Sequence, residues 1–504
     1  MDETCDEACD GARSGVCDEA CAGCRDADFS ALRLPLPQDV DRLKGAGSLA
    51  EAARACRALL QAGTDPVSAA RLRLEAMRLE RLAAQYPVTR QGAVEELRRS
   101  CPNVAAADLE RLERKGLIDW RMVNGEARYL ASWLRTLRLY AGELPGLDPA
   151  PSDADLLDAA IAEMRERSAA ARGFTLRAGL SVLGAPARAR VRAWLPVAAA
   201  CPQHAVAGVL DVAPGATFAR PDAPQRTVCW ESSERRDFFV TYRVRTNAPY
   251  VDLWSEEGIR RAAGAILAPS GTPVPAPAPC DLAEREPHVV FTPLVRDVAA
   301  RIARDALGAG REAAVARGGR LTPHEQLELA RGVYDFLTHE VLYRFQPNYA
   351  QLDCIADTVL ATRRADCGMF SVTFISLCRA LGIPARWQSG LFVTPDGAGP
   401  HDWAMWHVDG IGWLWADCSF GADAVREGSE ERRRHYFGNL DPFRAACNRE
   451  FFSAFEPAGD GARWDPFDNQ LGEASVEGRG LDAPEMRRSI ELLEFGGRAQ
   501  QGKA

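Results

Sequence analysis

The spacing of apolar residues changes several times along the chain and predicts helices, then strands, then both together. Residues 30–172 carry Ala, Leu, Arg and Glu at helical spacing, which predicts a mainly helical region. Residues 173–267 contain segments such as ARVRAWLPV and DFFVTYRVRTN, in which apolar and polar side chains alternate as on half-buried strands. From residue 288 both patterns occur, after a Pro-rich linker at residues 268–287. We therefore expect three folded regions.

Within the helical region, residues 85–130 contain two helical patterns followed by a hairpin signal, Asn124-Gly125. The order helix, helix, hairpin resembles a winged-helix module. The second helix carries three acidic residues, Asp108, Glu110 and Glu113. Because their charge would repel phosphates, we expect a packing or partner-binding role rather than DNA binding. A DNA-linked regulator is a third interpretation of the protein, and salt-dependent DNA affinity would test it.

The segment RRADCGMFSVTFISLCRALGIPAR poses the central question, whether Cys367 is a packed thiol or a nucleophile. Asp366 can cap a helix that begins at Cys367, and Gly382 can end it. A thiol in the first helical turn lies at the positive end of the helix dipole, which favours the reactive thiolate. Gly368 would leave room for a substrate to approach. A buried cysteine is usually packing, so Cys367 needs support from other residues.

That support comes from the segment HDWAMWHVDGIGWLWAD, which predicts two strands joined by a tight turn. If Val408 pairs with Gly412, Asp417 lies diagonal to His401 on the same face, within side-chain reach. His401 could then take the proton of the Cys367 thiol while Asp417 orients the ring. A shift of the register by one residue would place the two side chains on opposite faces.

These residues, in this order, resemble the transglutaminase-like superfamily of papain-fold cysteine enzymes. DCGMFSVTFISLCRALGIPAR is similar to the family's nucleophile helix and the strand after it. HDWAMWHVDGIGWLWAD is similar to its His-x-Trp … Gly-Trp … Asp segment. The resemblance covers roughly residues 290–425. It implies that Cys367 is the nucleophile, His401 the base and Asp417 the acid that orients the base.

The resemblance also implies an α+β fold. A papain-like core at residues 288–425, with the nucleophile helix packed on an antiparallel sheet, would follow a β-sandwich-like domain and the N-terminal helical region. The β-rich region before the core resembles the domain that precedes it in some bacterial members. Residues 426–504 would be a C-terminal extension that packs on the core.

The chemistry implied by the resemblance is acyl transfer through a thioester, on an amide or peptide bond of a protein or peptide substrate. Water as the acceptor gives a protease or amidase, and an amine gives a crosslinking enzyme; the fold does not choose between them. The alternative is a catalytically inactive fold that serves as a binding module or scaffold.

Two further sets of residues are candidates for substrate contacts. Tyr343 or Gln346, just before the nucleophile helix, would stabilise the oxyanion beside the backbone N–H of Cys367. Three aromatic residues would form a substrate slot, Trp387, Trp403 and Trp406. Packing in the core explains these tryptophans equally well.

Residues 1–28 form an acidic tail that holds five cysteines, Cys5, Cys9, Cys17, Cys21 and Cys24. Their spacing, C-x3-C and then C-x3-C-x2-C, allows a zinc ion or an iron–sulfur cluster. The triplet is also similar to that of radical-SAM enzymes, but no barrel pattern follows it. A disordered or redox-active tail is the other interpretation. For the core we expect no cofactor, because it has no Asp-rich calcium loop.

Composition narrows the function classes. The chain has 504 residues, of which 47% are hydrophobic and 26% charged, as in a soluble protein of several domains. The net charge of −9 argues against nucleic acid as a main partner. No stretch of about 18 apolar residues occurs, so we expect no membrane contact. The N-terminus lacks an apolar signal core, so the expected location is the cytoplasm.

Overall fold

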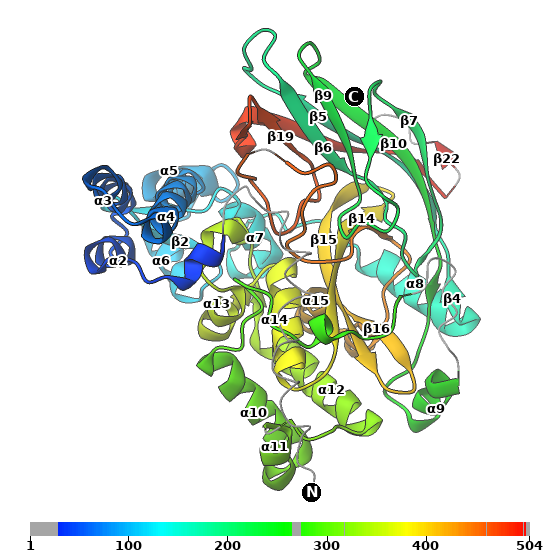
Figure 1. Ribbon diagram of the computed structural model, residues 1–504. Coiled ribbons are helices and arrows are strands. Elements are labelled where there is room, and N and C mark those ends of the chain that lie inside the picture. The colour runs from blue at the N-terminus through cyan, green and yellow to red at the C-terminus, as the bar shows by residue number, and fades with distance from the viewer. Residues whose placement is uncertain (1–28, 265–273, 317, 460, 497, 500–504) are drawn as a thin grey trace, which may run out of the picture.

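The computed structural model describes residues 29–264, 274–316, 318–459, 461–496 and 498–499, which form an α+β protein. Figure 1 shows N-terminal helices on one side, a β-sandwich at the top, and a core of helices and a sheet below it. The five N-terminal cysteines lie outside the described residues, so their metal site stays a prediction. Within the described residues, every helix is too short or too polar to cross a bilayer.

The N-terminal part is built from two groups of helices, in which η marks a 3₁₀ helix. The first group is η1 (Phe29–Arg33), α2 (Gln38–Gly45), α3 (Leu49–Ala62) and α4 (Pro66–Ala84). The second is α5 (Arg90–Arg98), α6 (Ala106–Arg114), α7 (Trp133–Leu139) and η2 (Ala141–Glu143). The next helix, α8 (Ala154–Arg167), lies on the opposite side of the molecule in Figure 1 and contacts α16 (Glu430–His435). Local sequence explains where α4 starts, because the Asp65 side chain accepts from the N–H of Val67 at 3.1 Å and Pro66 occupies the first turn.

The expected hairpin is confirmed. β2 (Trp120–Val123) pairs with β3 (Glu126–Tyr129), and β3 also pairs with β1 (Val88–Thr89). Asn124 and Gly125 have φ angles of 52° and 90°, the left-handed values that a type I′ turn requires.

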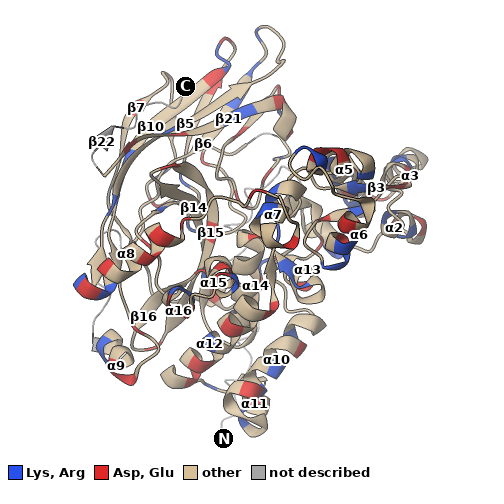
Figure 2. Cartoon of the chain, turned by 180° about the vertical axis from the view of Figure 1, so that it is seen from behind, with Lys and Arg blue, Asp and Glu red and all other residues tan. Residues whose placement is uncertain are grey.

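Acidic and basic residues are mixed along the two helices before this hairpin, α5 and α6 (Figure 2). Glu110 and Glu113 of α6 both form ion pairs with Arg90 of α5. A surface of mixed sign gives little net attraction for a phosphate backbone.

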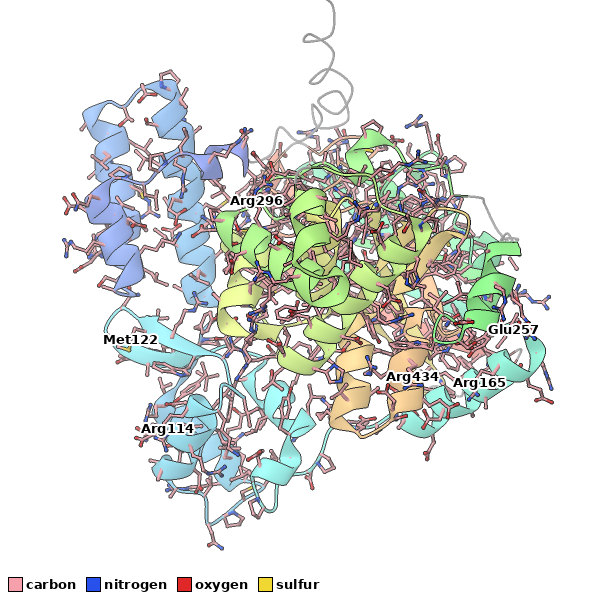
Figure 3. The ribbon with its side chains drawn as sticks, turned by 90° about the horizontal axis from the view of Figure 1, so that it is seen from below. Arg114, Met122, Arg165, Glu257, Arg296 and Arg434 are labelled. Atoms are coloured by element: carbon pink, nitrogen blue, oxygen red, sulfur yellow. The ribbon has the colours of Figure 1, made fainter. Side chains whose placement is uncertain are left out.

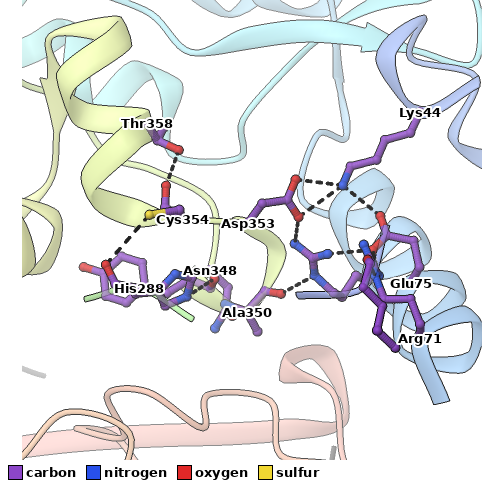
Figure 4. Close-up of polar contacts among 12 residues, drawn as sticks. Lys44, Arg71, Glu75, His288, Asn348, Ala350, Asp353, Cys354 and Thr358 are labelled. Carbon is purple, nitrogen blue, oxygen red and sulfur yellow. Dashed lines mark hydrogen bonds and ion pairs between the residues drawn. The ribbon is translucent and has the colours of Figure 1, made fainter. Parts of the chain in front are cut away.

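A buried ion-pair network fastens the N-terminal helices to the core (Figure 4). Glu75 of α4 accepts from Arg71 and Arg78 at 2.6 Å each, and Nζ of Lys44 lies 2.9 Å from it. Arg78 and Lys44 also reach Asp353 of the core, at 2.7 and 2.9 Å. Glu75 is 1% exposed, so three cations surround one buried carboxylate.

The same helices hold the segment that leads to the nucleophile helix. The Tyr140 hydroxyl donates to the carbonyl of Tyr343 at 2.8 Å. The N–H of Asn348 donates to the side-chain oxygen of Gln85 at 2.7 Å. The N-terminal part therefore supports one wall of the site described below.

Two five-stranded antiparallel sheets form the β-sandwich. One sheet has the order β22-β21-β5-β10-β7 and the other β20-β19-β6-β9-β8. The strands that precede the core are β5 (Gly173–Val182), β6 (Val191–Pro196), β7 (His204–Val212), β8 (Thr217–Phe218), β9 (Thr227–Ser232) and β10 (Asp237–Thr246). The strands that follow the core are β19 (Glu473–Val476), β20 (Arg479–Gly480), β21 (Met486–Phe495) and β22 (Arg498–Ala499).

The expectation that residues 426–504 form an extension on the core needs correction. β21 pairs with β5 from Met486↔Val182 to Phe495↔Phe174, and β19 pairs with β6. The last strands therefore belong to the sandwich, and the core is inserted between β10 and β19. Alternating apolar side chains of β5 and β10 pack in one cluster with Met486 and Val476, which is why the late strands are needed to cover the sandwich core.

Short elements lie between the larger parts. β4 (Ala169–Ala170) precedes the sandwich, and η5 (Ala483–Glu485) lies between β20 and β21. The elements between β10 and the core are β11 (Ala248–Pro249), α9 (Glu256–Gly264) and η3 (Pro279–Asp281). The helices of the core are α10 (Pro293–Leu307), α11 (Ala309–Ala316), α12 (Pro323–Glu340), η4 (Tyr349–Gln351), α13 (Ile355–Thr362), α14 (Cys367–Ala380), α15 (Cys418–Arg426) and α16 (Glu430–His435). A capping box begins α12, since Thr322 accepts from the N–H of Glu325 and Glu325 accepts from that of Thr322.

The core sheet has the strand order β17-β16-β15-β14-β18 and is antiparallel. Its strands are β14 (Ala385–Thr394), β15 (Gly397–Val408), β16 (Gly412–Ala416), β17 (Phe437–Gly438) and β18 (Arg444–Asn448). A short parallel pair, β12 (Leu342–Tyr343) and β13 (Arg364–Ala365), precedes α14. α14 packs against β14 and β15, so one helix and one sheet place the candidate catalytic residues.

Candidate active site

Cys367 is the first residue of α14, as the sequence predicts. The Asp366 side chain accepts from the N–H of Met369 at 3.1 Å and caps the helix. Most of the helix is buried in the largest hydrophobic cluster, and Gly382 with a φ of 81° follows its end. The position of the half-buried Cys367 is therefore set by the packing of the whole helix.

The space beside Gly368 is filled by protein, which corrects the expectation that it admits a substrate. A Cβ atom at Gly368 would lie 2.1 Å from the Tyr349 hydroxyl oxygen and 2.7 Å from the ring carbon that bears it. That hydroxyl donates to Asp366 at 2.7 Å. Glycine is required here because the tyrosine ring packs directly on the first turn of the helix.

His401 and Asp417 come together through the register that the sequence predicts. Val408 pairs with Gly412, and the ladder of β15 and β16 runs back to Ala404↔Ala416. His401 Nε2 then lies 2.7 Å from Oδ2 of Asp417. Both side chains are buried, with 6% and 0% exposure, so the contact is shielded from water.

Asp417 is held in its charged form by its surroundings. Burial alone would raise the pKa of this carboxyl, but His401 and Arg444 outweigh burial and hold the pKa below its ordinary value. Arg444 Nη1 lies 2.9 Å from Oδ2. The other oxygen accepts from the Ser419 hydroxyl at 2.8 Å and from the N–H of Phe420 at 3.0 Å, which caps α15. A charged, fixed carboxylate is what a histidine base needs to keep one tautomer.

The Cys367 thiol hydrogen-bonds to Asp402, which no motif in the sequence singles out. Its Sγ donates to Oδ2 of Asp402 at 3.1 Å. Burial raises the pKa of the thiol well above its ordinary value, and the carboxyl groups of Asp402 and Asp366 raise it further. The expectation that the helix dipole favours the thiolate is therefore wrong for this conformation, because burial and then the acidic neighbours outweigh the dipole.

Asp402 belongs to a buried polar network between β15 and the segment 449–472. Its Oδ1 accepts from Nε2 of Gln470 at 2.6 Å, and the same nitrogen donates to the carbonyl of His401 at 2.9 Å. A second carboxyl, Asp468, is hydrogen-bonded to Asp402 and accepts from the Ser389 hydroxyl at 2.7 Å. Burial raises the pKa of Asp402 to about 7.

One part of the chain matches a known family. Residues 313–418 match the family described as the transglutaminase-like superfamily, and this stretch includes Cys367, His401 and Asp417. No curated protein matches the sequence.

Two solved structures are similar to parts of this chain. A candidate cysteine protease from Cytophaga hutchinsonii aligns with a TM-score of 0.32 and 15% identity, over 64% of this chain and 92% of that chain. The periplasmic domain of TgpA from Pseudomonas aeruginosa aligns with a TM-score of 0.25 and 15% identity, over 55% of this chain and 96% of that chain.

Of the two residues expected to form an oxyanion site, Tyr343 lies beside Cys367, whereas the Gln346 side chain binds another group. The Tyr343 side chain is hydrogen-bonded to Cys367, and burial followed by the charge of Cys367 raises the pKa of its hydroxyl. That hydroxyl therefore stays a donor close to the sulfur. Gln346 Nε2 donates to the carbonyl of Arg344 at 3.1 Å, so its amide is engaged elsewhere.

The three tryptophans do not form a slot. Their exposed fractions are 2% for Trp387 and 0% for Trp403 and Trp406, and all three lie in hydrophobic clusters. Trp403 Nε1 donates to the side-chain oxygen of Gln388 at 2.5 Å. Packing was the correct interpretation, because each indole is enclosed by its own sheet and by the layers on either side.

One cavity of about 410 Å³ lies between α8, the segment 250–255 and α16. Its lining includes Arg165, Tyr250, Trp254 and Arg434, and Figure 3 shows the two arginines close together on this side of the molecule. Neither the Cys367 thiol nor the imidazole of the base is part of this lining, so the cavity is separate from the candidate active site. Among the described residues, no group of three His, Cys, Asp or Glu side chains is arranged to hold a metal ion.

Four residues of the site were missed from the sequence, namely Asp402, Arg444, Asp468 and Gln470. Asp402 carried one usable signal: a carboxylate inside a strand of tryptophans and other apolar residues must have a partner if it is buried. The other three lie in later segments that only the fold brings to β15, so a single sequence holds no signal that links them to the thiol.

Proposed function

We propose that the protein is a cysteine enzyme that acts on amide or peptide bonds through a thioester at Cys367. One observation carries the proposal. His401 and Asp417 form a buried pair at 2.7 Å on the sheet against which the Cys367 helix packs, inside a transglutaminase-like segment. A nucleophile, a base and a residue that orients the base are the parts that covalent acyl transfer needs.

In the proposed reaction the Cys367 sulfur attacks the carbonyl carbon of the amide and the amine leaves. The negative oxygen of the adduct is stabilised by the backbone N–H of Cys367 and the Tyr343 hydroxyl. The His401–Asp417 pair serves as the base of the site. Water as the acceptor gives hydrolysis and an amine gives transfer, and a protein or peptide supplies the acyl group.

The test is to trap the acyl-enzyme. The purified protein is incubated with a panel of peptide amides and activated esters, and its intact mass is measured at short times. We expect a mass increase equal to one acyl group, located on Cys367 by peptide mapping and absent in Cys367→Ser. Cys280→Ser, which alters an exposed thiol away from the site, should behave as the unmodified protein. Acylation that persists in Cys367→Ser would overturn the proposal.

A second candidate function is a binding module in which the transglutaminase-like fold is inactive. The hydrogen bond from the thiol to Asp402, together with the raised pKa of the thiol, favours it because a protonated sulfur is a poor nucleophile. Alkylation of Cys367 by iodoacetamide between pH 5 and 9, in the unmodified protein and in His401→Ala, separates the two. A thiol whose alkylation does not depend on His401, in a protein that forms no acyl-enzyme, supports the binding module.

A further inference from the structure

Asp402 is the group toward which the thiol proton points. Its Oδ2 accepts from Cys367 Sγ at 3.1 Å, while its Oδ1 is fixed by Gln470 at 2.6 Å. Because Gln470 also donates to the His401 carbonyl, the carboxyl group and the base are positioned by one side chain. At 2% exposure Asp402 has little access to water, so the thiol and its acidic neighbours are the groups with which it can exchange a proton.

A second acid shares the charge of Asp402. Asp468 is hydrogen-bonded to it, and Asp468 in turn accepts from Ser389. Two buried carboxyl groups in contact cannot both be ionised without a large cost, so the pair holds one proton and one negative charge near neutrality. This arrangement lets Asp402 be a carboxylate in one step and a carboxylic acid in the next.

The titratable groups that act on Asp402 from the packed elements are acidic side chains and one tyrosine. They are Asp366 and Cys367 at the start of α14, Tyr349 of η4, and Asp465 and Asp468 of the segment 449–472. Among the described residues, no Lys or Arg forms a hydrogen bond or ion pair with Asp402. With no cation to hold it as a carboxylate, Asp402 gains a proton readily, which is the property a general base needs.

We propose that Asp402 is a second catalytic residue, which receives the thiol proton when the Cys367 sulfur attacks. The inference rests on the proposed acyl transfer at this site. The S–H bond breaks as an O–H bond forms at Oδ2 of Asp402. The electron pair released on sulfur forms the C–S bond, and the π electrons of the carbonyl group move to its oxygen. When the adduct collapses, the C–N bond breaks and the leaving nitrogen takes the proton from Oδ2.

His401 then serves the second half of the reaction. The ring nitrogen that is not bound to Asp417 takes a proton from water or an amine as that molecule attacks the thioester. The C–S bond breaks, and the released thiolate regains a proton as His401 returns to its neutral form.

The test compares Asp402→Asn with the unmodified protein by two measurements. The first is the pH profile of Cys367 alkylation by iodoacetamide, which needs no substrate. Removing the negative neighbour should move its midpoint to lower pH by about one unit, a change of about tenfold in thiolate at neutral pH. The second is turnover of an amide found by the acyl-enzyme trap, which should fall by about 100-fold or more. Asp409→Asn, in the turn between β15 and β16, is the matched control and should change neither.

These opposite effects, a more reactive thiol and a slower enzyme, are not what a merely structural role produces. An unchanged alkylation midpoint in folded Asp402→Asn overturns the inference, as does amide turnover within twofold of normal. If no amide is turned over by any form, the acyl-transfer proposal fails, while the alkylation shift still shows whether Asp402 holds the thiol proton.

Asp468→Ala, which removes the hydrogen-bond donor, keeps the test decisive if Asp402→Asn does not fold. The infrared S–H stretching band of Cys367, isolated by subtracting Cys367→Ser, reports the ionisation of its acceptor. Removal of the second acid should move the pH midpoint of this band to higher pH, because the hydrogen bond from Asp468 lowers the pKa of Asp402. A band that does not change with pH, or a midpoint that does not move, overturns the inference.

Discussion

Arg444 and His401 bind the same oxygen of Asp417: Nη1 of Arg444 lies 2.9 Å and Nε2 of His401 2.7 Å from Oδ2. Arg444 also reaches Asp441, at 2.9 Å through Nε and 2.6 Å through Nη2. Its guanidinium is 1% exposed and lies 4.2 Å from the centre of the Phe420 ring. The orientation of the candidate base therefore depends on a buried arginine from β18, an edge strand of the sheet.

Replacing Arg444 with Met should destabilise the protein by about 3–5 kcal/mol, because two buried carboxylates lose their cation. Urea denaturation at pH 7 measures the loss. Arg434→Met is the control, since the Arg434 side chain is 53% exposed and should contribute less than about 0.5 kcal/mol. Equal stability of the two variants would show that the buried pairs contribute nothing net.

Asp417 has two roles that a pair of variants can separate. Asn can accept the N–H of Phe420 and keep the helix cap, but it cannot stabilise a protonated His401. We expect Asp417→Asn to retain most of its thermal stability and lose about 10²–10⁴-fold in amide turnover. Asp417→Ala should lose the turnover and a further ~1 kcal/mol of stability. Normal turnover in folded Asp417→Asn would remove this residue from the mechanism.

Gly368→Ala should be poorly tolerated although alanine favours helices. The new methyl group would overlap the Tyr349 ring and push its hydroxyl away from Asp366, for a loss of about 1–3 kcal/mol. Gly399→Ala on β15 is the matched control, because a Cβ there meets no atom within 4 Å. Thermal unfolding of the two variants gives the comparison, and a loss no larger in Gly368→Ala would contradict the packing of Tyr349.

Glu75 predicts an acid-sensitive link between the N-terminal helices and the core. Burial would raise its pKa, but Arg78, Lys44 and Arg71 lower it below the ordinary value. Its stabilisation is therefore present above the unfolded pKa of about 4.3 and is lost as pH falls below it. We expect Glu75→Gln to lose about 3–5 kcal/mol at pH 7 and much less at pH 3, measured by urea denaturation. Exposed Glu51→Gln is the control and should change little at either pH.

Asp402 predicts the opposite pH dependence. Its folded pKa of about 7 exceeds the unfolded value of about 3.9, so the folded protein binds more protons between these values. The contribution of Asp402 to stability is therefore full at low pH and falls as pH rises through about 7. Relative to the unmodified protein, Asp402→Asn should gain about 1–3 kcal/mol between pH 4.5 and pH 8. A difference that does not change with pH would mean that Asp402 ionises normally.

Local patterns in the sequence predicted the elements that hold the site. The Asp366 cap, the start of α14 and the pairing of Val408 with Gly412 follow from capping residues, apolar spacing and a tight turn, all within a few residues of one another. The contact of His401 with Asp417 followed from that register.

The remaining features depend on contacts between distant segments. β21 pairs with β5, which lies about 300 residues earlier in the chain, and neither strand has a sequence pattern that predicts this pairing. The acidic surroundings of the thiol come from Asp402 and from Asp468 of a later irregular segment. The tryptophans were ambiguous because an aromatic residue on a strand looks the same whether a ligand or another layer covers it.

The insertion of the core into the sandwich fixes the order in which a growing chain can complete the site. β5 and β6 emerge from the ribosome well before their partners β21 and β19. The sandwich therefore cannot be completed until the whole core has been synthesised. Gln470 and Asp468 lie just before those partners. A nascent chain can thus form the helix and strands around Cys367 before Asp468 and Gln470 are synthesised. The hydrogen bonds that fix Asp402 beside the thiol are therefore complete only when β19 and β21 join the sandwich.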